Sequence, residues 1–177
     1  MNKIARHPST VIAPLPAAMV SCGSTPEDYN IITIAWTGTV CSTPPMCYVS
    51  IRPERYSHKI IIKSKEFVIN LTPEKLVKEM DWCGVNSGRN YNKFKEPGLT
   101  PVNGQKVKAP LIMESPVNIE CMVKDIISLG SHDMFLSEIV AVNTDEGYEF
   151  DNSLVSYNNG KYYKLGEYLG YYGFSKK

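Results

Sequence analysis

Residues 31–52 read IITIAWTGTVCSTPPMCYVSIR, and this stretch decides the fold. Its two ends, residues 31–36 and 46–52, are rich in β-branched and aromatic residues and predict two short strands. The sequence CSTPP at residues 41–45 lies between them, and its prolines cannot donate to a strand ladder. The stretch therefore predicts two strands joined by a constrained connection.

Two helices are predicted outward from this stretch. Residues 56–64 form the first, with Ser57 near its N-cap. The second has Thr72 as its cap, Pro73 at its first helical position and an apolar stripe at helical spacing. It ends at Gly84, because glycine commonly stands just beyond the last helical residue.

The remaining periodic segments predict further strands. Apolar residues alternate along residues 67–71 and again along residues 116–129, and Gly130 separates the latter from a second strand over residues 134–142. Short strands with helices inserted between them indicate a mainly β fold with short helices and a partly open barrel. We expect residues 1–177 to form one globular domain.

The composition of the chain excludes several classes of function. Nineteen basic and eighteen acidic residues give a formal net charge of +1, so no global field favours nucleic acid or an anionic membrane surface. The N-terminal residues predict neither a secretory signal nor a membrane helix. Five scattered cysteines include no C-x-x-C pair, which predicts reduced thiols and no structural metal. We therefore expect a cytoplasmic protein without a nucleic-acid or membrane partner.

Residues 50–58, SIRPERYSH, form the first candidate site. Two guanidinium groups and several hydroxyl groups converge where a strand leads into a helix. Backbone N–H groups at the helix start, together with Arg52 and Arg55, suit a phosphate. The alternative is a capped surface helix with solvated arginines.

Two further segments carry candidate chemistry. Residues 82–94, WCGVNSGRNYNKF, run from a helix end into a donor-rich loop, which either wraps a heterocycle or phosphate or simply caps the helix. His132 begins a strand next to Asp133, whose carboxylate would orient or charge it. Such a histidine can gate proton transfer, and an exposed histidine without a role is the alternative.

Five segments taken together resemble the flavin reductase-like family, and most closely its flavoredoxin branch. They are NIITIAWTG at residues 30–38, CSTPPM at 41–46, SIRPERYS at 50–57, FVINL at 67–71 and GSHDMF at 130–135. The resemblance runs in order over nearly the whole chain. It implies a homodimeric, FMN-binding split β-barrel.

The resemblance also implies which residues contact FMN. The isoalloxazine ring is expected along Thr33, Ile34, Ala35 and Trp36. Amide or hydroxyl contacts are expected from Cys41 and Ser42. The phosphate and the ribityl chain are expected at Ser50, Arg52, Arg55, Tyr56 and Ser57. The later loop is expected to close the pocket with Ser87, Gly88, Arg89 and Lys93, and His132 to act near the flavin or an incoming electron donor.

The function implied by the resemblance is electron transfer through bound FMN, as in a flavin reductase or a flavoredoxin. NAD(P)H or a small electron-transfer protein such as a ferredoxin is the expected donor. FMN needs a dianion site, an apolar slot and nearby donors, which the three candidate segments supply. A non-catalytic flavin-storing or flavin-sensing barrel and a pyridoxamine-phosphate-oxidase-like oxidase are the alternatives.

Aromatic side chains recur among glycines in the C-terminal tail. They make the tail too apolar for a loose end, so we expect it to pack over the core or across a dimer interface. These residues are Tyr157, Tyr162, Tyr163, Tyr168, Tyr171, Tyr172 and Phe174.

Overall fold

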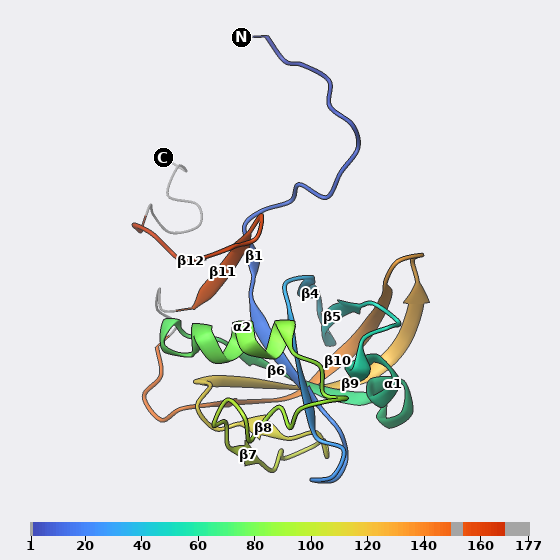
Figure 1. The fold of residues 1–177 in the computed structure, drawn as a ribbon, viewed down its shortest axis with the longest axis vertical. Coiled ribbons are helices and arrows are strands. Elements are labelled where there is room, and N and C mark those ends of the chain that lie inside the picture. Colours follow the sequence, from blue (N-terminus) through green and yellow to red (C-terminus); the bar gives the residue numbers. More distant parts are fainter. Residues whose placement is uncertain (1, 150–153, 169–177) are drawn as a thin grey trace.

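The computed structural model describes residues 2–149 and 154–168. Its main sheet has seven antiparallel strands in the order β3-β2-β6-β9-β10-β5-β4 (Figure 1). In chain order these strands are β2 (Ala18–Cys22), β3 (Asn30–Ile34), β4 (Thr37–Ser42), β5 (Pro45–Ile51), β6 (Glu66–Leu71), β9 (Val117–Ser128) and β10 (Asp133–Thr144). β3 and β4 stand at opposite ends of this order but are separated by two residues in the chain, so the sheet curls back on itself. The N–H of Ser50 in β5 donates to the C=O of Trp36 in this link at 2.9 Å and extends the β4–β5 ladder. The predicted mainly β fold is confirmed.

Strand β4 occupies the segment that the sequence analysis treated as a connection. It pairs with β5 along its length, down to the pairing of Ser42 with Pro45 at the turn. The prolines do not prevent this pairing, because Pro44 lies in the turn and Pro45 is the first residue of β5. β4 is also the last strand of the sheet, where an unpaired outer edge makes fewer demands on the backbone.

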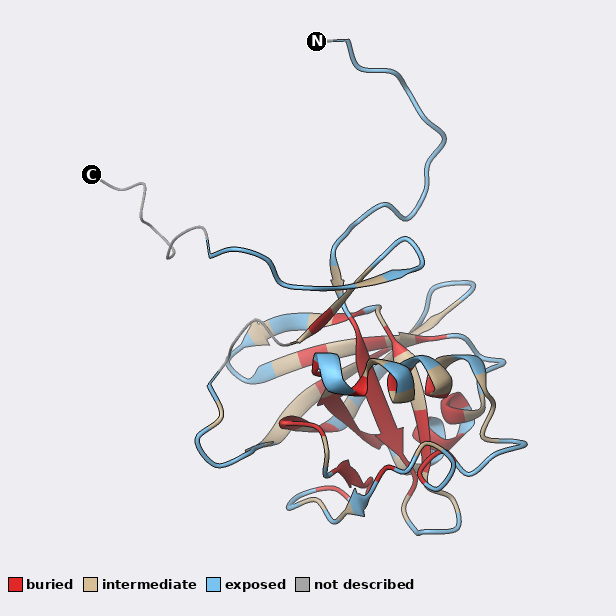
Figure 2. Cartoon of the chain, turned by 60° about the vertical axis from the view of Figure 1, so that its left-hand side comes forward, coloured by how far each residue is buried: buried red, intermediate tan, exposed pale blue. Residues whose placement is uncertain are grey.

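Alternation along the strands builds apolar clusters on both faces of the sheet, and Figure 2 shows the buried segments. Fully buried side chains inside the barrel include Val20, Val49, Phe67 and Phe135. A second apolar cluster contains Met19 of β2 and Met80 and Cys83 of the second long helix. The sheet is therefore packed on both sides of β2.

The two long helices differ from the prediction at their ends. α1 (Tyr56–Ser64) has Arg55 as its N-cap, and Ser57 lies buried in its first turn. The second begins with a 3-10 turn, η1 (Glu74–Leu76), whose N-cap is Pro73 in an extended conformation. Thr72 is therefore not the cap.

α2 (Val77–Val85) continues from this turn and contains Gly84, which the sequence analysis placed beyond the helix end. A Cβ at Gly84 would stand 3.3 Å from the Cβ of Thr33 in β3. The glycine therefore serves the close packing of α2 on β3 and does not end the helix. The helix ends instead at Asn86, whose extended backbone forms its C-cap.

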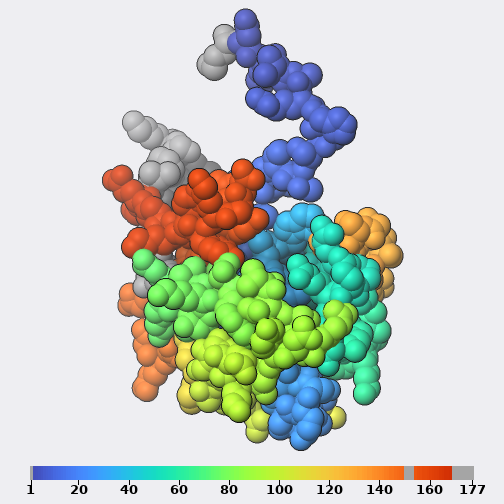
Figure 3. Space-filling model, in the orientation of Figure 1, coloured from blue at the N-terminus to red at the C-terminus, as the bar shows by residue number. Residues whose placement is uncertain are grey.

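Smaller sheets flank the barrel. β7 (Pro101–Val102) pairs with β8 (Leu111–Ile112), and β1 (Leu15–Pro16) pairs with β11 (Val155–Asn158), which pairs with β12 (Lys161–Lys164). Residues ahead of β1 extend away from the body of the molecule (Figure 3). Within the described residues, no helix is long and apolar enough to span a membrane.

The C-terminal hairpin of β11 and β12 confirms part of the prediction for the tail. Tyr157 and Tyr162 pack against the apolar cluster that includes α2, with their ring centroids 6.0 Å apart. Tyr163 and Tyr168 are exposed. Tyr171, Tyr172 and Phe174 lie outside the described residues.

Candidate functional site

A cavity of about 300 Å³ opens beside the first turn of α1, and we call it the α1 cavity. It lies between the start of β3, the turn ahead of α1, the end of α2 and the loop that follows α2. Seven of the expected site residues line it: Arg55, Tyr56, Ser57, Ser87, Gly88, Arg89 and Lys93. Two segments far apart in the sequence, residues 54–57 and 83–93, thus meet around one space.

A second cavity of about 340 Å³ follows β3, and we call it the β3 cavity. It is lined by the four residues expected beside a flat ring, Thr33, Ile34, Ala35 and Trp36, and by His132. Arg55 and Gly84 line both cavities, so the two adjoin. Together they offer a polar compartment, the α1 cavity, and a second compartment along strand β3.

Asn30 lines the α1 cavity and was missing from the expected site. Its Nδ2 donates to the Oγ of Ser57 at 2.7 Å, and its buried Oδ1 has no hydrogen-bond partner among the described residues. Gly88 lies against this amide, because a Cβ there would stand 2.1 Å from Oδ1. Asn30 heads the NIITIAWTG segment, and this position was the signal that could have singled it out.

Cationic groups gather around the α1 cavity. The Nη2 of Arg89 donates to the C=O of Glu54 at 3.0 Å, and its guanidinium lies 5.7 Å from the ring centroid of Tyr56. The Nζ of Lys93 is buried and donates to the C=O of Cys83 at 2.5 Å. Burial is the main cause that lowers the pKa of Lys93. With Arg55 and the N-terminus of α1, these groups suit an anion such as a phosphate.

Ser50 and Arg52 line the β3 cavity and not the α1 cavity. Both precede the turn into α1, so they lie on the β5 side of the site, whereas Arg55 lies at the helix start. The side chain of Arg52 is 52% exposed, and its Nη1 lies 3.7 Å from the Oε1 of Glu54. Of the two arginines, Arg55 is therefore the one placed to meet a ligand in the α1 cavity.

Cys41 and Ser42 line neither of the two cavities. They stand at the far end of β4, next to the turn into β5, and the Sγ of Cys41 lies 3.4 Å from the C=O of Thr43. All five cysteines are free thiols. In the part of the chain that the structure describes, no group of three or more His, Cys, Asp or Glu side chains could hold a metal ion.

The ring of His132 stacks on the indole of Trp36, with centroids 4.4 Å apart and planes at 33°. Its Nδ1 lies 2.9 Å from the Oγ of Ser131. Burial, and then the charge of Arg52, lower the pKa of His132 from its ordinary value of 6.5. The expectation of a direct contact between the Asp133 carboxylate and His132 is wrong, because this carboxylate bonds the Nε2 of His58 instead.

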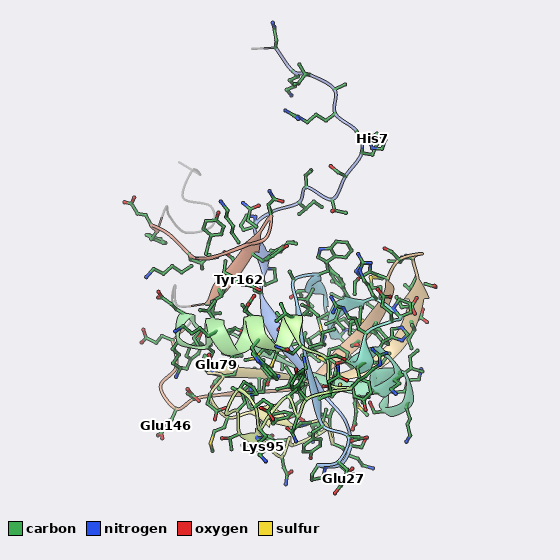
Figure 4. All side chains as sticks on the ribbon, in the orientation of Figure 1. His7, Glu27, Glu79, Lys95, Glu146 and Tyr162 are labelled. Carbon is green, nitrogen blue, oxygen red and sulfur yellow. The ribbon has the colours of Figure 1, made fainter. Side chains whose placement is uncertain are left out.

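Three further residues of the β3 cavity were missing from the expected site: Asp81, Tyr157 and Tyr162. The hydroxyl of Tyr162 in β12 donates to the Oδ1 of Asp81 in α2 at 2.9 Å, and Figure 4 shows Tyr162 above α2. Burial and this carboxylate raise the pKa of Tyr162 to about 12. The aromatic pattern of the tail was the signal that could have pointed to Tyr157 and Tyr162. Nothing in the sequence singled out Asp81, the partner of Tyr162 on α2.

Comparison with known proteins identifies the family of the chain. The flavin reductase like domain matches residues 12–166. The chain belongs to the flavin reductase-like family. Within this family, the chain resembles the flavoredoxin of Desulfovibrio vulgaris (Miyazaki F), with 31% identity and a TM-score of 0.89 over 99% of this chain and 100% of that one.

Two more relatives extend the comparison of this flavin reductase-like chain. An FMN-binding protein of Thermus thermophilus with bound p-hydroxybenzaldehyde is 22% identical, with a TM-score of 0.82 over 97% of this chain and 98% of that one. An uncharacterized protein of Aeropyrum pernix is 38% identical over 115 residues, which are 64% of this chain and 44% of that protein. The matches confirm the split-barrel fold, the resemblance to flavoredoxin and a flavin-binding redox function.

Proposed function

We propose that this flavin reductase-like protein holds FMN across the two cavities and passes electrons through it. The phosphate lies in the α1 cavity and the isoalloxazine ring in the β3 cavity. The observation that carries the proposal is that the two cavities adjoin. Arg55 and Gly84 line both, which suits a ligand with an anionic end in one and a flat ring in the other.

The residues of the α1 cavity fit the phosphate and ribityl part of FMN. Arg55, Arg89 and the N-terminus of α1 supply donors and positive charge for a dianion. The unpartnered Oδ1 of Asn30 is an acceptor that suits a ribityl hydroxyl. Gly88 keeps the loop close to that oxygen, because any side chain would fill the space.

The residues of the β3 cavity fit the ring and its chemistry. Bound FMN supplies the redox chemistry, and the chain orients the ring and limits access to it. Trp36 and His132 form one wall through their stacked rings. Since the Nδ1 of His132 faces Ser131, its Nε2 is the nitrogen that exchanges a proton near the ring.

The proposal includes a homodimer, a cytoplasmic location and NAD(P)H or a small electron-transfer protein as donor. Ile4, Val11 and Ile12 in the N-terminal arm are 74%, 79% and 83% exposed, and Trp36 beside the β3 cavity is 36% exposed. Apolar groups left uncovered in this way support a second copy of the chain as their cover. The five free thiols support a reducing compartment.

Reconstitution and anaerobic stopped-flow reduction test this function. The purified chain, loaded with FMN, is mixed with NADH, NADPH or a reduced ferredoxin, and loss of the flavin absorbance is followed. Rapid reduction by at least one donor is expected. A colourless protein that cannot be loaded with FMN contradicts the proposal, and saturable FMN binding without reduction by any donor favours the storage or sensing barrel.

A further inference from the structure

A largely buried His–Asp pair lies next to His132 and outside both cavities. The Nε2 of His58 and the Oδ2 of Asp133 are 2.8 Å apart, and the two side chains are 9% and 15% exposed. The imidazole of His58 also meets the ring of Phe135 edge-on, with centroids 5.4 Å apart. Hydrogen bonds from His58 and then Ser128 lower the pKa of Asp133, so the carboxylate is ionised and accepts both bonds. The pair is thus fixed by packing as well as by charge.

Asp133 is the first residue of β10 and immediately follows His132. The turn between β9 and β10 is tight, because the N–H of Leu129 donates to the C=O of His132 at 2.9 Å and Gly130 has a φ of +94°. Leu129 is 59% exposed, so the tip of this turn packs on little of the barrel. The anchoring of Asp133 therefore bears directly on where the His132 ring lies.

His58 occupies the first turn of α1, adjacent to Ser57, whose Oγ accepts a hydrogen bond from Asn30 at the α1 cavity. One helical turn thus presents one side chain to the α1 cavity and the next to the β9–β10 turn. The Asp133 bond is a polar connection between that helix and the strand that follows His132, beside the contact of His58 with Phe135. No other ion pair among the described residues joins α1 to this turn.

We propose that His58 and Asp133 are positioning residues that hold the His132 ring against Trp36 at the edge of the β3 cavity. Neither touches the proposed flavin, and both act through the turn that carries His132. The effect of this positioning on catalysis rests on the proposed function, in which His132 exchanges a proton near the flavin ring. The geometry itself is a property of the FMN-free chain.

Proton NMR of the three histidines tests this positioning in FMN-free protein, with His132→Gln identifying the His132 signals. In the wild type the Trp36 ring current shifts the His132 ring protons away from their free-imidazole positions, because the two rings are stacked. Asp133→Ala is expected to lose most of this shift. Asp133→Asn keeps an acceptor oxygen for His58 and is expected to retain most of it.

Two further variants keep the test decisive. His58→Phe fills a similar space and keeps an aromatic edge towards Phe135, but it cannot donate to Asp133. It is therefore expected to lose the His132 shift, and it provides the test if Asp133→Ala folds poorly. Glu138→Gln breaks the pair with Lys124 (2.5 Å) on the same hairpin and serves as the control that leaves the shift unchanged. A full His132 shift in folded His58→Phe or Asp133→Ala overturns the proposal.

The FMN-loaded protein separates this inference from the proposed function. Both disruptive variants are expected to bind FMN about as tightly as the wild type, because Arg55, Ser57 and Gly88 remain in place. Their rate of flavin reduction is expected to fall at saturating donor, with little change in the donor concentration for half-saturation. Failure to bind FMN at all would contradict the proposed function, whereas the NMR result would still decide the positioning role.

Discussion

Gly88→Ala tests the FMN site through a contact that the structure fixes closely. The added Cβ would stand 2.1 Å from the Oδ1 of Asn30 and 2.9 Å from the Cδ1 of Tyr56, so the Asn30 amide must move. Its buried 2.7 Å bond to Ser57 would then break. Leaving a buried polar group without its partner costs about 1–3 kcal/mol. The same displacement takes the Asn30 Oδ1 away from the ribityl chain that it is proposed to contact, and losing that hydrogen bond, at about 1–3 kcal/mol, would weaken FMN binding by about 5-fold to 150-fold.

Quenching of FMN fluorescence during titration with the FMN-free protein measures this loss. Gly166→Ala is the matched control, because an added Cβ there would meet no atom of the described residues within 4 Å and Gly166 lines neither cavity. Thermal unfolding of both variants confirms that each is folded. Wild-type FMN affinity in folded Gly88→Ala would refute the placement of the ligand between Asn30 and the loop.

Three other predictions follow from the same geometry. Arg55→Ala should weaken FMN binding by about 1.5–3 kcal/mol in a fluorescence titration, and Arg52→Ala by less, because Arg55 lines the α1 cavity and Arg52 does not; equal losses would contradict this order. Tyr162→Phe removes the bond to Asp81 and should speed FMN dissociation in stopped-flow displacement, and an unchanged rate would show that the hairpin does not restrain the ligand. Protonated His132 should quench the fluorescence of Trp36, and the midpoint of this quenching should lie below pH 6.5 because burial and the charge of Arg52 lower the pKa of His132. A midpoint above pH 6.5, or quenching that persists in His132→Gln, would contradict this prediction.

Most of the fold and much of the site could be predicted from short-range patterns. The alternation along β5 and β9 predicted strands from the sequence alone. The family resemblance placed Arg55, Ser57 and the loop around Gly88 at one site, and these residues line the α1 cavity. Edge strand β4 was missed because the two prolines that follow it suggested a break, although they lie at the hairpin turn into β5, where no ladder bond is lost.

The errors at the site come from side-chain pairs whose members lie far apart in the chain. Asp133 follows His132 directly, yet its side chain turns away from His132 and reaches His58, 75 residues earlier in the chain. Asp81 and Tyr162 are likewise 81 residues apart and meet only because β12 folds back over α2. Such long-range pairs leave no periodic signal in one sequence.

Comparison of FMN with riboflavin in the same fluorescence titration tests the central claim most directly. Riboflavin carries the same ring without the phosphate. Its ring can occupy the β3 cavity, but it has no phosphate to bind the charged groups of the α1 cavity. A charge-assisted phosphate bond of about 1.5–3 kcal/mol predicts that FMN binds at least about 10-fold more tightly, and that Arg55→Ala removes most of this preference. Equal affinity for the two flavins, or binding of neither, would contradict the account.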